Sequence, residues 1–134
     1  MNEPSIFTRI INGEIPAHKV YEDDKVIAFL DINPITPGHT LVVPKQQIES
    51  LWDLDTELYE YVMKIVHMVA DRQKEVLKPN RVGLLLAGIG VPHAHVHVLP
   101  LEGGLEATVT MHHQASAGDP DHSALAQMAE RLKF

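Results

Sequence analysis

The chain of 134 residues contains no cysteine. This absence excludes disulfide bonds, thiol catalysis and every zinc site that uses cysteine, so a metal would depend on histidine and carboxylate ligands. No apolar run approaches the length that spans a bilayer, and residues 1–5 lack the basic and apolar regions of a signal peptide. We therefore expect a cytoplasmic protein with no membrane partner.

Basic residues are also scarce. Lysine and arginine together number 11 against 18 aspartates and glutamates, which gives a formal net charge of −7. Because polyphosphate binding relies on clustered Lys and Arg, this balance argues against a nucleic-acid partner. A small anionic substrate would be held locally, by backbone N–H groups and imidazoles. The hydrophobic content of 45% is typical of a globular protein, and the length predicts a single domain over residues 1–134.

The most informative stretch has histidines at alternate positions: His93, His95 and His97, separated by Ala94 and Val96. Alternation predicts a β-strand over residues 93–99, in which the three imidazoles share one face. Core filling is a poor explanation, because every buried ring needs partners for two polar nitrogens. Metal binding and nucleophilic catalysis by a neutral imidazole both remain open, since the spacing alone does not separate them.

The remaining pattern predicts an α+β fold. Strands are expected at residues 19–21, 26–30, 39–44, 81–87, 93–99 and 107–112, with the continuously apolar 81–87 as a central strand. Helices are expected after an N-cap at Ser5, from Asp53 or Asp55 to about Leu77, and after an N-cap at Asp119 with Pro120 at the first position. The architecture expected is a sheet of about five antiparallel strands with a long covering helix and a C-terminal helix.

Further polar and glycine residues lie next to the expected strands. Asp31 follows strand 26–30 and His39 opens strand 39–44, where it is placed to face a site. The turn before the histidine motif contains Gly88 and Gly90, which are suited to bring backbone N–H groups close to a phosphate. Ordinary turn roles for Asp31 and for the two glycines are the competing interpretation.

Together these pieces resemble the histidine triad (HIT) family of nucleotide hydrolases and transferases, over roughly residues 5–100. The stretch from His93 to Leu99 fits the family's His-x-His-x-His followed by two apolar residues. Other blocks that look like the family are Ser5-Ile6-Phe7 with Ile10, Glu14-Ile15-Pro16-Ala17, Tyr21-Glu22-Asp23-Asp24, Ala28-Phe29-Leu30-Asp31-Ile32 and Pro37-Gly38-His39-Thr40-Leu41-Val42-Val43-Pro44-Lys45. Residues 101–134 form a divergent C-terminal segment.

The resemblance implies a HIT-like fold, a homodimer with joined sheets, and chemistry that needs no metal or cofactor. It implies that His95 is the nucleophile, that His97 and His93 flank it, and that His39 holds the imidazole or the phosphate. Asp31 would accept hydrogen bonds from the ribose hydroxyls. The residues implied to enclose the purine base are Ile6, Phe7, Ile10, Phe29 and Ile32, while Gly88 and Gly90 would lie by the phosphate.

The expected function is that of a nucleotide phosphoramidase or a related nucleotidyl hydrolase or transferase. It would act on the α-phosphate of a purine nucleotide through a covalent nucleotidyl-histidine. Two features depart from the family: Ala87 stands where many members have an asparagine, before a short loop, and the only tryptophan is Trp52 rather than one in the tail. The alternatives are a dinucleoside polyphosphate hydrolase, a nucleotide-binding protein with little turnover, and a histidine-based metal protein.

Overall fold

The computed structural model describes residues 3–88, 90–103 and 119–134. Its helices and strands, in chain order, are α1 (Ile6–Ile11), β1 (Lys19–Glu22), β2 (Val26–Leu30), β3 (Thr40–Pro44), the short 3₁₀ helix η1 (Leu51–Asp53), α2 (Thr56–Leu77), β4 (Arg81–Leu85), β5 (Val96–Leu101) and α4 (His122–Leu132). In the described part of the chain, no helix is long and apolar enough to cross a membrane.

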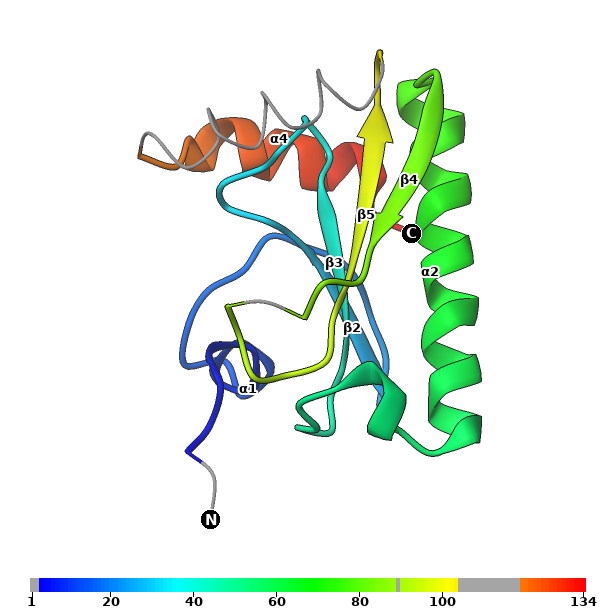
Figure 1. Ribbon diagram of the computed structural model, residues 1–134. Helices are drawn as coiled ribbons and strands as arrows, with labels where there is room; N and C mark the ends of the chain where they lie inside the picture. The colour runs from blue at the N-terminus through cyan, green and yellow to red at the C-terminus, as the bar shows by residue number, and fades with distance from the viewer. Residues whose placement is uncertain (1–2, 89, 104–118) are drawn as a thin grey trace.

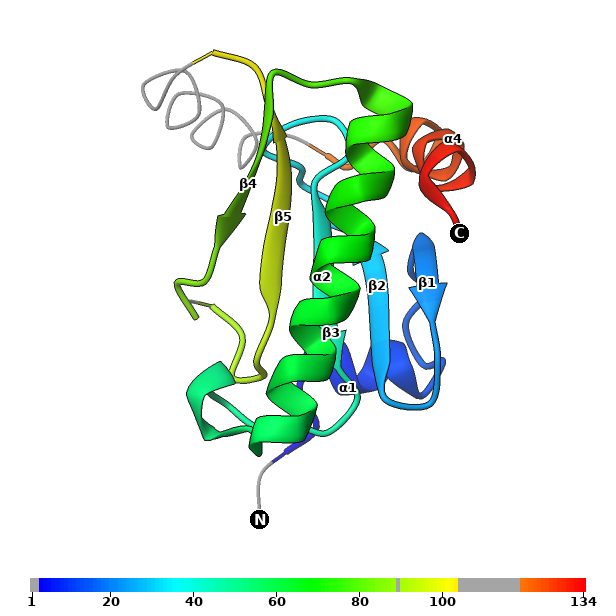
Figure 2. The same cartoon turned by 90° about the vertical axis from the view of Figure 1, so that its right-hand side faces the viewer.

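The five strands form one antiparallel sheet in the order β1-β2-β3-β5-β4. Helix α2 covers one face of this sheet (Figure 2), and α1 lies on the opposite side (Figure 1). The main core lies under α2 and α4 and contains buried residues of the sheet and both helices, among them Val26, Val42, Val62, Ile65, Val69, Val96, Val98, Leu125 and Leu132. The α+β fold expected from the sequence is confirmed.

Local signals explain where the helices begin and end. The Ser5 hydroxyl accepts from the Thr8 N–H at the start of α1, and the Asp55 carboxylate accepts from the Leu58 N–H at the start of α2. Helix α2 ends at Leu77, after which Lys78 takes a left-handed conformation (φ 49°) immediately before Pro79. The predicted caps at Ser5 and Asp55 are therefore confirmed.

Two predictions about other elements need correction, and a third concerns residues that the structure does not describe. The apolar run at 81–87 is not a central strand in the described part of the chain, where β4 pairs with β5 alone and forms an edge of the sheet. The last helix is capped by Asp121, whose side chain accepts from the Ala124 N–H, so it begins at His122 rather than at Pro120. The strand expected at 107–112 lies outside the described residues.

The histidine motif is only partly a strand, because β5 begins at Val96. Before it, the His93 N–H donates to the Val91 carbonyl in a tight turn, and the Ala94 N–H donates to the Ile48 carbonyl of the loop after β3. These bonds hold residues 93–95 outside the strand ladder. The expected alternation still holds across the sheet for the apolar positions, since Ala94, Val96 and Val98 all join the core beneath α2.

The two edges of the sheet differ. At the β1 edge, the Phe134 N–H donates to the Val20 carbonyl, and the Phe134 ring stacks on Tyr21 with 5.1 Å between the ring centroids. At the β4 edge, Leu84, Leu85 and Leu86 are 46%, 40% and 38% exposed. The chain thus caps one edge with its own C-terminus and leaves apolar side chains exposed at the other.

Candidate active site

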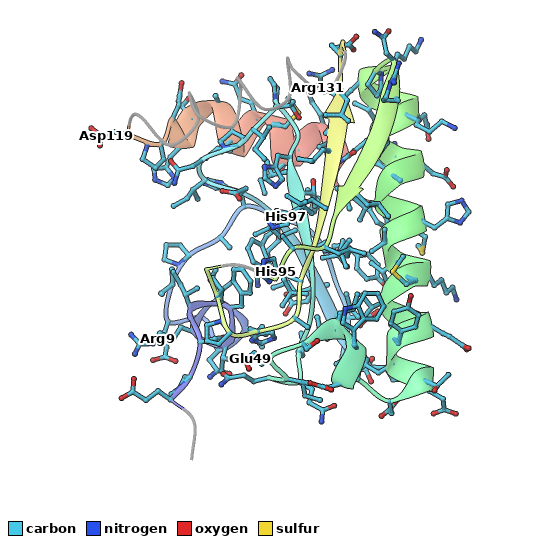
Figure 3. The ribbon with its side chains drawn as sticks, viewed as in Figure 1. Arg9, Glu49, His95, His97, Asp119 and Arg131 are labelled. Carbon is cyan, nitrogen blue, oxygen red and sulfur yellow. The ribbon has the colours of Figure 1, made fainter. Side chains whose placement is uncertain are left out.

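A cavity of about 370 Å³ is lined in part by α1 and therefore lies on the side of the sheet where α1 packs. His95 and His97 lie on this side, away from α2 (Figure 3). The cavity is lined by Ile6, Phe7, Ile10, Ile15, Pro16, Ala17, Phe29, Leu30, Asp31, Ile32, Asn33, Leu41, Val91, His95 and His97. Five apolar residues expected to enclose a base therefore meet Asp31 and two of the three motif histidines in one place.

His93 does not line the cavity. Its side chain is fully buried, with Nε2 2.7 Å from the Pro44 carbonyl oxygen and Nδ1 2.7 Å from the Ser5 hydroxyl. Because a carbonyl only accepts, Nε2 carries the proton, and Nδ1 accepts from the Ser5 hydroxyl. Burial lowers the pKa of the His93 imidazole, which favours this neutral form.

The contact between Ser5 and His93 belongs to a small network that ties α1 to the histidine segment. Thr8 donates its hydroxyl to Gln47 Oε1 at 2.6 Å, and the Ser5 N–H donates to the same oxygen at 2.8 Å. The Gln47 amide donates in turn to the Glu3 carbonyl. The helix that forms one wall of the cavity is thus fixed to the loop after β3 and to His93.

The proton position on His95 follows from the backbone. Its Nδ1 lies 2.7 Å from the His93 carbonyl oxygen, so Nδ1 donates and, in the neutral ring, Nε2 keeps its lone pair. The Phe7 ring packs edge-on against the imidazole, with centroids 5.1 Å apart. The backbone therefore holds the neutral form of His95 in one tautomer, at the wall of the cavity.

His39 and His97 form a second fixed pair. The Ile35 N–H donates to His39 Nδ1 at 3.1 Å, so the proton of neutral His39 is on Nε2. His39 Nε2 lies 2.9 Å from His97 Nδ1 and donates to it. Neutral His97 therefore carries its own proton on Nε2, and its ring lies 4.9 Å from that of His95, centroid to centroid. His39 itself is buried behind His97 and does not line the cavity.

Asp31 is brought to this pair by the loop between β2 and β3. The Asp31 N–H donates to the His39 carbonyl, and its Oδ1 accepts from the Asn33 N–H at 2.9 Å. Its Oδ2 lies 3.7 Å from His39 Nε2. One ligand atom each from Asp31, His39 and His97 lies within 4.8 Å of the others, a spacing that a metal ion would accept. The metal hypothesis therefore points to these three residues rather than to the three motif histidines.

Some of the predicted site residues do not line the cavity. Gly88 and Gly90 both have positive φ, at 68° and 95°, but neither lines the cavity, whereas Val91 of the same loop does. Sequence reasoning missed the walls formed by Ile15, Pro16 and Ala17, and by Leu41. A signal for Leu41 existed, because it alternates with His39 and so projects from the same face of the sheet.

The buried His93 predicts a pH dependence of stability. An unfolded histidine with a pKa of about 6.5 takes up its proton at a higher pH than the folded His93, so the unfolded state binds more protons as the pH falls. We expect the free energy of unfolding to be fully maintained above pH 7 and to decrease on acidification below about 6.5. Urea titrations at several pH values measure this decrease. It should be smaller in His93→Asn, whereas exposed His67→Asn should retain it, and equal slopes in all three proteins would refute the assignment.

Comparison with known proteins agrees with the fold and the motif. A family model described as the HIT domain matches residues 12–104. An uncharacterized HIT-like protein of Borreliella burgdorferi is 47% identical over 102 residues, which cover 71% of this chain and 73% of that protein. The chain belongs to the HIT family.

Solved structures extend the similarity in space. A HIT-like protein from Bartonella henselae, described as involved in cell-cycle regulation, has a TM-score of 0.81 at 34% identity over 98% of this chain and 96% of that one. A hypothetical histidine triad nucleotide-binding protein from Sulfolobus tokodaii has a TM-score of 0.68 at 28% identity, over 94% and 92% of the two chains. A HIT family hydrolase from Clostridium thermocellum has 0.62 at 32% identity, over 79% and 95%.

Proposed function

We propose that the protein is a nucleotide phosphoramidase or a related nucleotidyl hydrolase or transferase that acts on the α-phosphate of a purine nucleotide. The observation that carries the proposal is the His95 imidazole, whose Nδ1–H is bonded to the His93 carbonyl while the ring lines the cavity. This arrangement leaves Nε2 unprotonated, as a nucleophile requires. The solved relatives described as a nucleotide-binding protein and as a hydrolase support this class of function.

The cavity suits a nucleoside. Its wall near α1 and β2 is apolar, with Ile6, Phe7, Ile10 and Phe29, and would take the flat base. Asp31 also lines the cavity, beside His97, and would accept hydrogen bonds from the ribose hydroxyls. A base at the apolar wall and a ribose at Asp31 would direct the α-phosphate towards His95 and His97.

The chemistry proceeds in two displacements. His95 Nε2 attacks the α-phosphorus, and the bond from phosphorus to the leaving group breaks while the leaving group takes a proton from solvent. The Nε2–H of His97 donates a hydrogen bond to the negative charge that develops on the phosphoryl oxygens. Water then attacks the phosphorus and gives up a proton to solvent, and the bond from phosphorus to Nε2 breaks, which releases the nucleoside monophosphate and restores the neutral imidazole. In this scheme His39 orients His97, and His93 acts through its carbonyl on His95.

A substrate panel tests the proposal. Wild type incubated with adenosine monophosphoramidate, with diadenosine polyphosphates and with an adenylate bearing an amine leaving group should release adenosine monophosphate from at least one of them. Preferential turnover of the phosphoramidate supports a nucleotide phosphoramidase, and preferential turnover of the dinucleotides supports a dinucleoside polyphosphate hydrolase. Tight binding of adenosine monophosphate without turnover would instead support the nucleotide-binding alternative that Ala87 and the short loop suggest. Turnover that is lost with a chelator and restored by metal would favour the metal hypothesis.

We also propose that two copies join their sheets through β4. This edge exposes Leu84, Leu85 and Leu86, whereas the opposite edge is covered by Phe134. We expect wild type to elute and scatter light with twice the mass of the 14.9 kDa chain. Leu84→Glu combined with Leu86→Glu should give a monomer, because charges at an exposed edge oppose strand pairing. Lys19→Glu on β1 is the control, and a monomeric wild type would refute the proposal.

A further inference from the structure

Helix α2 places one amide in the middle of its apolar contact with the sheet. Its inward stripe contains Val62, Val66 and Val69, and Gln73 follows one turn later on the same stripe with only 1% of its side chain exposed. A polar side chain at such a position lowers stability unless it finds hydrogen-bond partners. Its partners therefore indicate what the residue does.

Gln73 contacts two strands at once. Its Nε2 lies 3.0 Å from the Gly38 carbonyl oxygen, 3.2 Å from the Val98 carbonyl oxygen and 3.3 Å from Thr40 Oγ1. Carbonyl oxygens only accept, so the amide nitrogen must face them. The Thr40 hydroxyl donates to the same Gly38 carbonyl at 2.8 Å, which leaves its oxygen to accept from Gln73. One side chain thus connects the start of β3 with the middle of β5.

The groups held by Gln73 are sequence neighbours of the His39–His97 pair. Gly38 and Thr40 stand on either side of His39, and Val98 follows His97. The pairing of β3 with β5 ends at Thr40 and Val98. Because Gln73 also binds the Gly38 carbonyl, it extends the connection between the two segments beyond this last pair. His39 and His97 meet on the opposite face of the sheet, with 2.9 Å between Nε2 and Nδ1.

We propose that Gln73 is a positioning residue that sets the separation of His39 and His97 from the far side of the sheet. The hydrogen bond from His39 fixes the proton of neutral His97 on Nε2. Without the amide, the segment from Gly38 to Thr40 is held less firmly against β5, the bond between the imidazoles lengthens, and His97 populates a second tautomer. The effect on turnover rests on the proposed function, whereas the effect on the imidazoles does not.

The test compares Gln73→Met with Val69→Ala, a change one helical turn away in the same stripe that touches neither carbonyl. Methionine matches the glutamine side chain in length and removes Gln73 Oε1, a buried acceptor that has no partner among the described residues, so this variant should stay folded. Thr40→Val is a second variant that removes one of the three contacts and leaves α2 unchanged.

The first readout is long-range ¹H–¹⁵N NMR of the imidazoles in the unliganded protein. Gln73→Met should shift the nitrogen resonances of His39 and His97 towards a mixture of tautomers, with little change at His93 and His95, and Thr40→Val should give a smaller shift of the same kind. The second readout is turnover, in which kcat should fall about tenfold while KM changes little.

Unchanged His39 and His97 resonances in both variants would overturn the proposal, and so would an equal shift in Val69→Ala. If wild type turns over no nucleotide, the proposed function fails, and the NMR comparison still decides the role of Gln73.

Discussion

His95→Asn is expected to lose at least about 10³-fold in turnover, because His95 is the one imidazole in the described lining of the cavity whose neutral form keeps Nε2 unprotonated. Asparagine is the informative replacement, since its amide N–H can still donate to the His93 carbonyl that holds His95 Nδ1 at 2.7 Å. The variant therefore keeps the backbone contact and removes only the nucleophilic Nε2. Steady-state assays on the best substrate of the panel measure the loss.

Two controls make this result interpretable. His67→Asn changes a histidine on the exposed face of α2 and should retain full turnover. Binding of adenosine monophosphate to His95→Asn should stay within a few-fold of wild type, because the apolar wall and Asp31 are untouched. Turnover by His95→Asn within about tenfold of wild type would remove His95 as the nucleophile.

Asp31→Ala is expected to weaken the binding of adenosine monophosphate by about 10- to 100-fold, the range given by the loss of one hydrogen bond to a charged acceptor. The same change should have little effect on the 2′,3′-dideoxy nucleotide, which has no ribose hydroxyls to donate. Calorimetry of both nucleotides with wild type and with Asp31→Ala gives a thermodynamic cycle, which isolates the interaction of Asp31 with the ribose hydroxyls. The expected pattern is a strong ribose preference in wild type that disappears in the variant.

The local role of Asp31 needs its own control. Its Oδ1 accepts from the Asn33 N–H, so Asp31→Ala also loosens the loop that carries Ile32. Asp31→Asn keeps an oxygen for this bond and should bind the nucleotide with an affinity between those of wild type and Asp31→Ala. An equal loss of affinity for the ribo and the dideoxy nucleotide would assign Asp31 to the loop alone.

Much of the site could be predicted because short-range patterns in the sequence, such as alternation along a strand, determine where its residues lie. Alternation correctly predicts that Ala94, Val96 and Val98 share one face of the sheet, and that His95 and His97 do not face the core. A turn-rich loop after a strand places Asp31 within reach of His39. These are local properties of the chain. They hold in the folded protein because β3 and β5 pair in a fixed register, which keeps each side chain on the face that its position in the strand predicts.

The errors arise where distant parts of the chain compete with the local pattern. His93 follows the period of the motif, yet its ring is bonded to Ser5 and to the Pro44 carbonyl, and neither partner is visible in the motif itself. The apolar run of β4 indicates burial, but it does not say which neighbour provides it, and the strand lies at an edge. Gln73 gives no sequence signal beyond being a polar residue at an apolar position of its helix.

The proposed mechanism requires that His95 Nε2 becomes covalently bonded to the α-phosphorus. Mixing the protein with a nucleotide substrate labelled at the α-phosphate, quenching within the first turnover and digesting the protein tests this claim directly. We predict a labelled peptide containing residue 95, acid-labile and base-stable, with the nucleotide on Nε2 and with no label in His95→Asn. Turnover by wild type with no protein-bound label, or label on another histidine, would contradict the assignment of His95 as the nucleophile.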